Sequence, residues 1–265
     1  MIFAIQALQQ ATLPRIPLLG TFINVATVLI GGTLGLIIGN RLPERIKAIV
    51  IAAIGLMTLV IGISSALKTA NALIPLLALV IGGIFGELVN IDGGLALLGD
   101  WLKKRVERPE AELDFTAAFV IASLQFCVGP LTILGSINDG LSGNFSLLAI
   151  KAILDGFSAI VFASSLGKGV LFSSATILIV QGGISLLAGL IRPLLISDPT
   201  LALSAQPRLI ELSAAGGVIL IGLGLNILNL QRIKVANLLP ALLCAPALVA
   251  LLNVLNIPLN FGLGK

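Results

Sequence analysis

The sequence contains no histidine, and this absence excludes several kinds of catalytic and metal site. An HExxH zinc motif, a Ser-His-Asp triad and a histidine proton relay all need an imidazole. The phosphate-binding motifs GxxxxGKS and GxxxxGKT are missing too, since Gly167-Lys168-Gly169 has neither the upstream glycine nor a following Ser or Thr. We therefore expect no cofactor, no ATP-driven pumping by this chain alone and no enzymatic activity. An intramembrane enzyme using Asp155 and Asp139 is the least favoured alternative.

Charge is scarce as well, with 11% of the 265 residues charged, 57% hydrophobic and a mean hydropathy of +1.13. These values lie far outside those of soluble domains. A helix needs about 20 apolar residues to cross a bilayer, and roughly eight runs approach that length. They are Leu18–Gly39, Ile46–Leu67, Ala72–Val89, Phe115–Ile137, Phe145–Leu166, Val170–Ile191, Leu209–Leu228 and Val235–Leu255. The runs lack the alternation of a membrane barrel, so we predict an all-α polytopic membrane protein with a single transmembrane domain, residues 1–265.

The formal net charge is +4, and basic residues in a membrane chain mainly set its orientation, so we predict a lipid bilayer and no nucleic acid as partner. With the amino terminus outside, ten Lys and Arg fall in inner loops and five in outer segments. The ten are Arg41, Arg45, Lys47, Lys103, Lys104, Arg105, Arg108, Lys168, Arg232 and Lys234, and the five are Arg15, Lys68, Arg192, Arg208 and Lys265. The positive-inside rule then predicts both termini outside the cytoplasm.

Similar blocks recur in the same order in the two halves of the chain. The block ATVLIGGTLGLIIG from Ala26 resembles ATILIVQGGISLLAG from Ala175, and NALIP from Asn71 resembles NLLP from Asn237. Between them, Ala52, Ala53, Gly55 and Gly62 match Ala214, Ala215, Gly217 and Gly224 at one constant spacing. The units, residues 18–89 and 170–255, begin an odd number of crossings apart, so we predict an inverted three-helix repeat flanking a central pair, residues 115–166. The alternative is a duplicated but static bundle.

Three polar side chains are predicted to share one depth near the centre of the bilayer. A rise of about 1.5 Å per residue puts Gln125, Asp155 and Gln181 about 15 Å deep, and Lys151 about 9 Å deep. Lys151 and Asp155 are four residues apart, so they lie on one helical face and can neutralise each other. Charged residues at this depth usually face the bundle interior or water. Asp155 therefore either binds a cation or proton in exchange for Lys151, or forms a closed pair that only holds the helix in register.

Glycine and proline suggest interruptions beside these residues. Gly129–Pro130 is predicted to break a span, since proline removes a helical hydrogen bond, and Gly182-Gly183 is a second candidate break. A packing kink is the alternative. Asn138, Asp139, Gly140, Ser142, Gly143 and Asn144 are predicted to form a polar turn at the site. Glu87, with Asn90 and Asp92 just beyond it, indicates an inner vestibule or a solvated helix end.

Other polar and small residues point to packing between helices. Asn24, Glu211 and Asn226 lie at shallower depth, and we interpret them as interhelical hydrogen-bonding groups. Glycines four residues apart allow close helix approach, and they are Gly31, Gly35, Gly39, Gly82 and Gly86. We predict that these ladders pack within the chain, and the sequence leaves a homo-oligomer open.

Three stretches carry a resemblance to a known family. They are GTFINVATVLIGGTLGLIIGNRLP from Gly20, QFCVGPLTILGSINDGLSGN from Gln125 and KAILDGFSAIVFASSLGKGVLFSSA from Lys151. Together they resemble the bacterial membrane family called domain of unknown function 554, over nearly the whole chain after Leu18. The resemblance implies transport, with no substrate and no assigned site residues. LDGFSAIVFASSLGKG also resembles the Asp-containing helix of bacterial manganese exporters, which would imply divalent-cation traffic through Asp155.

These observations favour a secondary transporter of the bacterial inner membrane for an ion or small solute, with a cation or proton at Asp155. In this hypothesis Lys151 is the exchangeable counter-ion, Gln125 and Gln181 are ligands, and Gly129–Pro130 is the backbone break. A passive channel with the same lining is one alternative. A non-transporting scaffold is the other, and it would be favoured if Lys151 and Asp155 were sealed from water.

Overall fold

The computed structural model describes residues 18–39, 41–106, 114–198, 200–202 and 205–257, and no β-strand occurs in these ranges. Six of its helices are long and apolar enough to cross a membrane, and the number rises to eight if each of two bent helix pairs forms one span. The predicted all-α polytopic membrane fold with about eight spans is therefore confirmed.

The chain divides into two compact units that alternate along the sequence. The helices of unit 1 are α2 (Leu19–Gly39), α6 (Phe115–Cys127), α7 (Pro130–Ser142), α8 (Ser146–Leu166) and α9 (Gly169–Leu186). Those of unit 2 are α3 (Glu44–Ala66), α4 (Leu73–Val89), α5 (Ile91–Val106), α11 (Pro207–Ile227), the 3-10 turn η2 (Val235–Leu238) and α12 (Ala241–Val254). The unit boundary falls within α3, α7 and α10 (Ala188–Leu195). These units cut across the predicted repeat, which stays a prediction.

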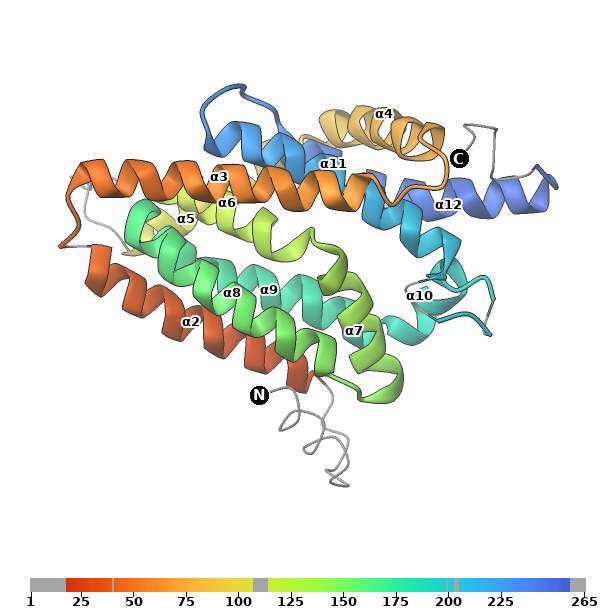
Figure 1. Ribbon diagram of the computed structural model, residues 1–265, viewed down its shortest axis with the longest axis horizontal. Helices are drawn as coiled ribbons and strands as arrows, with labels where there is room; N and C mark the ends of the chain where they lie inside the picture. The colour runs from red at the N-terminus through yellow and green to blue at the C-terminus, as the bar shows by residue number, and fades with distance from the viewer. Residues whose placement is uncertain (1–17, 40, 107–113, 199, 203–204, 258–265) are drawn as a thin grey trace. The chain divides into compact units, whose positions relative to one another are not determined.

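Unit 1 is built around a close parallel contact between α2 and α8 (Figure 1). Gly31, Gly35 and Gly39 lie directly against the backbone of α8, where a Cβ atom on any of them would collide with a carbonyl oxygen. Small residues at this spacing let two backbones approach closely. The glycine ladder of α2 therefore packs within the chain, as predicted, and it fixes the register of α2 on α8.

Unit 2 contains a reciprocal glycine contact between α3 and α11. A Cβ atom on Gly217 would lie 2.6 Å from the carbonyl oxygen of Gly62, and one on Gly224 would lie 3.1 Å from that of Gly55. Gly82 and Gly86 of α4 likewise lie against the backbone at the start of α12 and in η2, so this second ladder also packs within the chain. Glycines of α3, α4 and α11 thus let these helices of unit 2 approach their neighbours until the backbones are in contact.

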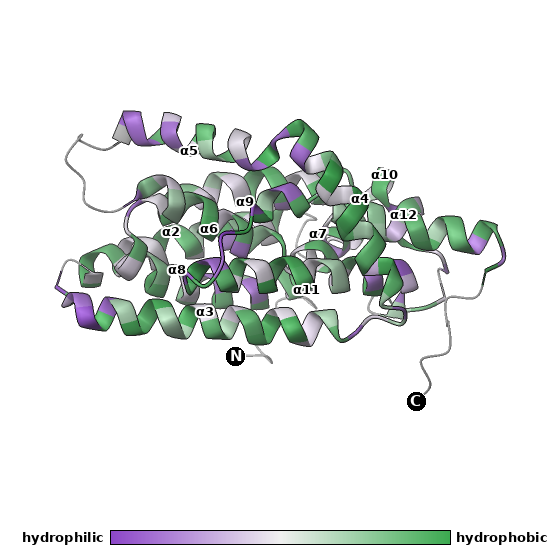
Figure 2. Cartoon of the chain, turned by 90° about the horizontal axis from the view of Figure 1, so that it is seen from above, coloured by the Kyte–Doolittle hydropathy of each residue, from purple (hydrophilic) through white to green (hydrophobic). Residues whose placement is uncertain are grey.

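Residues that follow α4 form a helix where the sequence indicated only an inner loop. Asn90 adopts a left-handed conformation with φ 57°, which ends α4, and α5 begins at Ile91 with a bend of 50° between the two helices. The basic residues Lys103, Lys104 and Arg105 lie in the last turn of α5. Figure 2 shows hydrophilic residues gathered along α5 and at the start of α3, whereas the rest of α3 is mostly hydrophobic.

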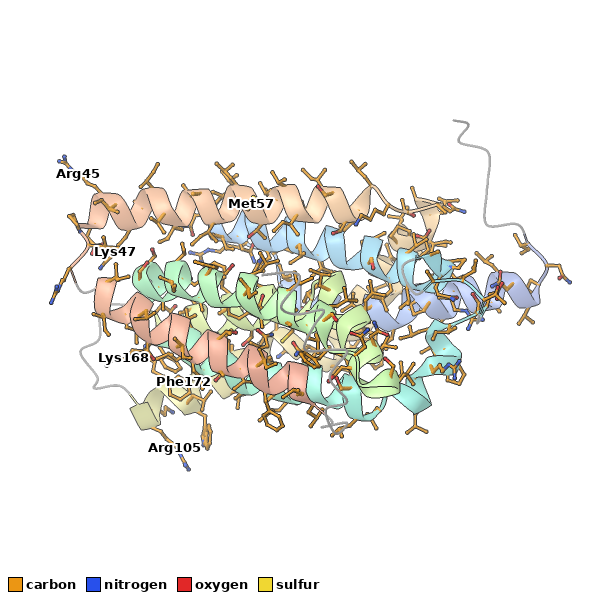
Figure 3. The ribbon with its side chains drawn as sticks, turned by 60° about the horizontal axis from the view of Figure 1, so that its bottom comes forward. Arg45, Lys47, Met57, Arg105, Lys168 and Phe172 are labelled. Atoms are coloured by element: carbon orange, nitrogen blue, oxygen red, sulfur yellow. The ribbon has the colours of Figure 1, made fainter. Side chains whose placement is uncertain are left out.

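Basic residues of unit 1 gather where α2 and α8 end. Arg45 and Lys47 follow α2, and Lys168 follows α8 (Figure 3). Because α2 and α8 are parallel, these two basic segments lie at the same end of the unit. Beyond Lys168, Phe172 packs on Phe115 of α6 with ring centroids 5.3 Å apart.

Candidate functional site

Lys151 and Asp155 form a buried ion pair on α8. They are separated by one helical turn, which brings the ammonium and the carboxylate together on the same face. Their side chains are 5% and 12% exposed. A charge at membrane depth is costly unless a partner of opposite charge or a hydrogen bond offsets it, and this pair supplies both.

Asn24 of α2 links this pair to α9. Its Nδ2 atom donates one hydrogen bond to Asp155 Oδ2 over 2.9 Å and another to Gln181 Oε1 over 3.0 Å. Gln181 Nε2 in turn donates to Thr21 Oγ1 over 3.3 Å. The orientation of the Asn24 amide is fixed by chemistry, because a flipped amide would place its oxygen against the carboxylate. The result is a continuous hydrogen-bonded chain from Lys151 through three helices to Thr21.

The glycine ladder of α2 explains why Asn24 reaches Asp155. Asn24 lies two turns before Gly31, whose backbone meets α8 at Gly156, next to Asp155. Asn24 and Thr21 are both fully buried, and the Asn24 Nδ2 and Thr21 Oγ1 atoms find their partners inside the unit. The sequence had suggested that Asn24 is a shallow packing residue, and its bond to Asp155 was not predicted. The depth of a residue along its own helix does not reveal how that helix is staggered against its neighbour.

Gln125 lies in the last turn of α6, a helix that contacts both α8 and α9. The predicted interruption follows directly: α6 ends at Cys127, α7 begins at Pro130, and the two helices meet at 60°. Gln125 is partly exposed, unlike the buried Gln181. Gln125 was predicted to lie with Asp155 and Gln181. In the structure it lies on α6, which contacts the helices of both residues, and it is close to the break between α6 and α7.

Asn138 and Asp139 lie within helix α7, so the predicted polar turn is shorter than expected. The helix continues to Ser142, whose hydroxyl donates to the Asn138 carbonyl over 2.7 Å, and the chain turns at Gly143 with φ 70°. The run of helix-weakening residues suggested a turn, but burial of one face of α7 overrides that local preference. Asn138 is partly exposed, whereas Asp139 is 3% exposed.

The second predicted break, at Gly182-Gly183, is wrong. Helix α9 runs without interruption from Gly169 to Leu186. Glycine keeps its backbone N–H, so it lowers helix propensity without removing a hydrogen bond, whereas proline removes one. The space beside Gly182 is occupied by Thr21 and Leu18, 3.7 and 3.8 Å from the position of an added Cβ atom.

Glu87 belongs to a separate polar cluster in unit 2. It forms an ion pair with Lys234 and accepts a hydrogen bond from Asn237 Nδ2 over 2.6 Å. Asn237 Oδ1 accepts from the Asp92 backbone N–H over 2.7 Å, which ties η2 to the start of α5. The bond to Glu87 raises the pKa of Lys234 above its usual value. Both ionic side chains are more than half exposed, so this cluster fits a solvated helix end as well as a vestibule.

Among the described residues, no three His, Cys, Asp or Glu side chains come close enough to hold a metal ion. The site in unit 1 therefore offers one carboxylate, two amides and hydroxyl groups, with an amine already in place. Such a set suits exchange of one positive charge for another at the Asp155 carboxylate.

Comparison with known proteins shows which family the chain belongs to. The family described as Protein of unknown function (DUF554) matches residues 19–250. The chain belongs to this family. The match runs from the first residue of α2 into α12, so it includes both units and every residue of the hydrogen-bonded chain.

Two relatives align over most of their length with this DUF554 member. The "Uncharacterized protein YqgA" of Escherichia coli (strain K12) is 35% identical over 235 residues, covering 88% of this chain and 96% of the relative. The "Uncharacterized membrane protein YdfK" of Bacillus subtilis (strain 168) is 25% identical over 242 residues, covering 90% of this chain and 98% of the relative. No solved structure matches the chain. The chain is thus a multi-pass membrane protein of an uncharacterised family.

Proposed function

We propose that this protein is a secondary transporter of the bacterial inner membrane that carries an ion or small solute through the Asp155 site. The observation that carries the proposal is the buried chain Lys151–Asp155–Asn24–Gln181. This carboxylate receives a neutral amide from a second helix in addition to the Lys151 ammonium. That amide can hold Asp155 while Lys151 is displaced.

The exchange step follows from charge balance. When a cation or proton binds the Asp155 carboxylate and neutralises it, the Lys151 ammonium releases one proton and becomes a neutral amine. Each state keeps one positive charge beside the carboxylate, so neither leaves an unpaired charge at membrane depth. The break between α6 and α7 supports the proposal, because non-helical backbone at membrane depth is tolerated where it lines a cavity.

The reciprocal contact of α3 with α11 supports the inverted repeat on which alternating access would depend. Gly55 and Gly62 correspond in sequence to Gly217 and Gly224, and each glycine lies near the counterpart of the other. A two-fold relation produces such a pattern, in which residue i meets j and j meets i. Repeats of opposite orientation are common in secondary transporters, where one bundle rocks against another.

Flux through the purified protein tests the proposal. Proteoliposomes loaded with a pH-sensitive dye would receive inward gradients of NaCl, KCl, MgCl2 and MnCl2 in turn. We expect at least one gradient to move protons faster than in protein-free liposomes, and Asp155→Asn to abolish that movement. Asp100→Asn, which changes an exposed acid on α5, serves as the matched control and should keep it. The proposal is wrong if Asp155→Asn leaves every flux and its proton coupling unchanged.

A scaffold without transport activity is the second candidate, and the deep burial of the ion pair favours it. Counted over the whole residue, Lys151 is 4% exposed and Asp155 is 8% exposed, so the pair resembles a locked contact. In that case no gradient moves protons through the wild-type protein, and Asp155→Asn acts on stability alone. A passive channel differs from both, since it would give sustained conductance without saturation or exchange.

A further inference from the structure

Six buried oxygen atoms of unit 1 have no hydrogen-bond partner within the described part of the chain, Asn24 Oδ1 and Ser165 Oγ among them, and the other four lie on α7 and α9. These four are Ser136 Oγ, Asp139 Oδ1, Asp139 Oδ2 and Ser185 Oγ. The residues are 0%, 3% and 4% exposed, respectively. Buried polar atoms nearly always have a partner, and a carboxylate at membrane depth is especially costly without one. A cation bound here would accept electron pairs from several of these oxygens at once.

Packing of α7 on α9 brings these atoms together. Ser136 and Asp139 are three residues apart, so they share one face of α7. The next residue, Gly140, lies directly against the carbonyl oxygen of Ser185, and an added Cβ atom there would also come within 2.7 Å of Ala188 Cβ. The Asp139 carboxylate consequently lies close to the Ser185 hydroxyl and to the backbone N–H of Gly20 at the start of α2, two donors that face it without reaching full hydrogen-bond geometry. Three helices converge on the carboxylate.

We propose that Ser136, Asp139 and Ser185 form a binding site for one monovalent cation of the sodium type. Carboxylate and hydroxyl oxygens are the ligands that hard cations take in proteins. A single positive charge balances the one carboxylate, whereas a divalent ion would leave a net charge buried. A proton would satisfy only one of the four oxygens, and a cation contacts several at once.

The position of this cation site connects it to the Asp155 chain. Ser185 follows Gln181 by one turn of α9, and Gly20 precedes Thr21, to which Gln181 donates. The cation site thus continues the polar chain from Asp155 toward the end of α9. The inference deepens the proposed function and rests on it, because it names the class of ion that moves. Its binding is nevertheless measurable without any flux.

Thermal unfolding of the full-length protein in detergent tests the site. NaCl would replace choline chloride at constant ionic strength while circular dichroism records the unfolding midpoint. A ligand that binds the folded state raises that midpoint in a saturable way. We expect sodium to do so for the wild type, and Asp139→Asn to abolish the effect. Asp100→Asn, at an exposed acid of α5, should keep it, and because the assay involves no flux, failure of this site is distinguishable from failure of the transport proposal.

Milder variants keep the test decisive if Asp139→Asn does not fold. Ser136→Ala and Ser185→Ala each remove one oxygen ligand, and we expect each to raise the half-saturating sodium concentration about tenfold. Ser142→Ala, which removes a hydroxyl at the exposed end of the same helix, should leave that concentration unchanged. The site is refuted if sodium and choline affect the wild type equally, or if Asp139→Asn keeps the sodium effect.

Discussion

Asn24 uses both N–H bonds of its side-chain amide, one toward Asp155 and one toward Gln181. The Oδ2 atom of Asp155 therefore accepts from two donors, the Lys151 ammonium and this amide. A buried carboxylate needs every donor within reach, because the interior of a membrane protein cannot replace them with bulk water. The amide is thus a structural requirement of the charged pair as well as its link to α9.

Replacing Asn24 by alanine should lower the free energy of unfolding by about 1–3 kcal/mol, since Asp155 and Gln181 each lose a donor. Unfolding of the purified protein in sodium dodecyl sulfate, followed by circular dichroism, measures the change. Thr33→Ala on the same helix is the control, because Thr33 is exposed and donates to the Leu29 carbonyl of its own turn. Equal losses from Asn24→Ala and Thr33→Ala would contradict the assignment.

The sequence indicated that Asp155 and Gln181 belong together, but it did not identify the side chain that joins them. Counting the helical rise placed Asp155 and Gln181 at one level, and the structure joins them through a single amide. The same counting puts Asn24 about 9 Å deep, closer to Lys151 than to Asp155. The bond to Asp155 exists because a side chain reaches one turn along the neighbouring helix. That reach depends on the stagger of α2 on α8, which only packing decides.

Glycine determines how the helices of each unit approach. Gly35 of α2 lies directly against the carbonyl of Ile160, and a Cβ atom there would also come within 3.0 Å of Ala163 Cβ. Gly183 of α9 has nothing within 4 Å of an added Cβ atom. Both glycines lie inside membrane-spanning helices and read alike in the sequence. Their surroundings give them opposite consequences when a methyl group is added.

Gly35→Ala should therefore destabilise the protein by about 1–3 kcal/mol, because α2 must move away from α8 to admit the methyl group. Gly183→Ala is the matched change and should be neutral or stabilising by up to about 1 kcal/mol, because alanine has the higher helix propensity. The same unfolding assay compares the two variants. A loss of stability from both, or from neither, would show that the close contact of α2 with α8 does not limit stability.

Helices that consist of long apolar runs were predicted correctly from the sequence, whereas helix boundaries set by short polar segments were not. The spans that contain α2, α3, α8 and α11 follow directly from hydropathy. Helix α5 was missed, since its charged residues read as a loop, although they occupy the last turn of a helix where cations are favourable. Gly129–Pro130 and Gly182-Gly183 looked like similar interruptions, yet only the pair with proline separates two helices.

At the scale of the whole molecule, the family match treats the chain as one continuous domain, whereas the packing of its helices divides it into two units. DUF554 covers residues 19–250, whereas the units alternate along the sequence. Matching repeat helices contact one another inside the units: α2 meets α9 in unit 1, and α4 meets α12 in unit 2. An inverted repeat would place each helix beside its counterpart in this way. The repeat remains a prediction that an experimental structure of a relative would test.

Helix α4 offers a direct test of the predicted orientation. It has 17 residues, a length of about 26 Å, so it nearly matches the hydrocarbon core of a bilayer. Lys68 precedes it and Lys104 follows it on α5, and from the excess of basic residues we predict that the α5 side faces the cytoplasm. With Cys127→Ser and Cys244→Ser as the background, Lys68→Cys should react with a membrane-impermeant maleimide in spheroplasts. Lys104→Cys should react only after the membrane is permeabilised.

The labelling pattern separates the competing topologies because each predicts a different outcome. The reverse pattern would place both termini in the cytoplasm and overturn the orientation. Labelling of both cysteines from outside would mean that the bent pair of α4 and α5 enters the membrane and returns, so α4 would not cross. The background protein without cysteine gives the zero level. If Lys68→Cys is labelled from outside and Lys104→Cys is not, the turn between α3 and α4 lies outside and the basic end of α5 lies inside. Helix α4 then crosses the membrane between the two positions, as its length and apolar composition allow.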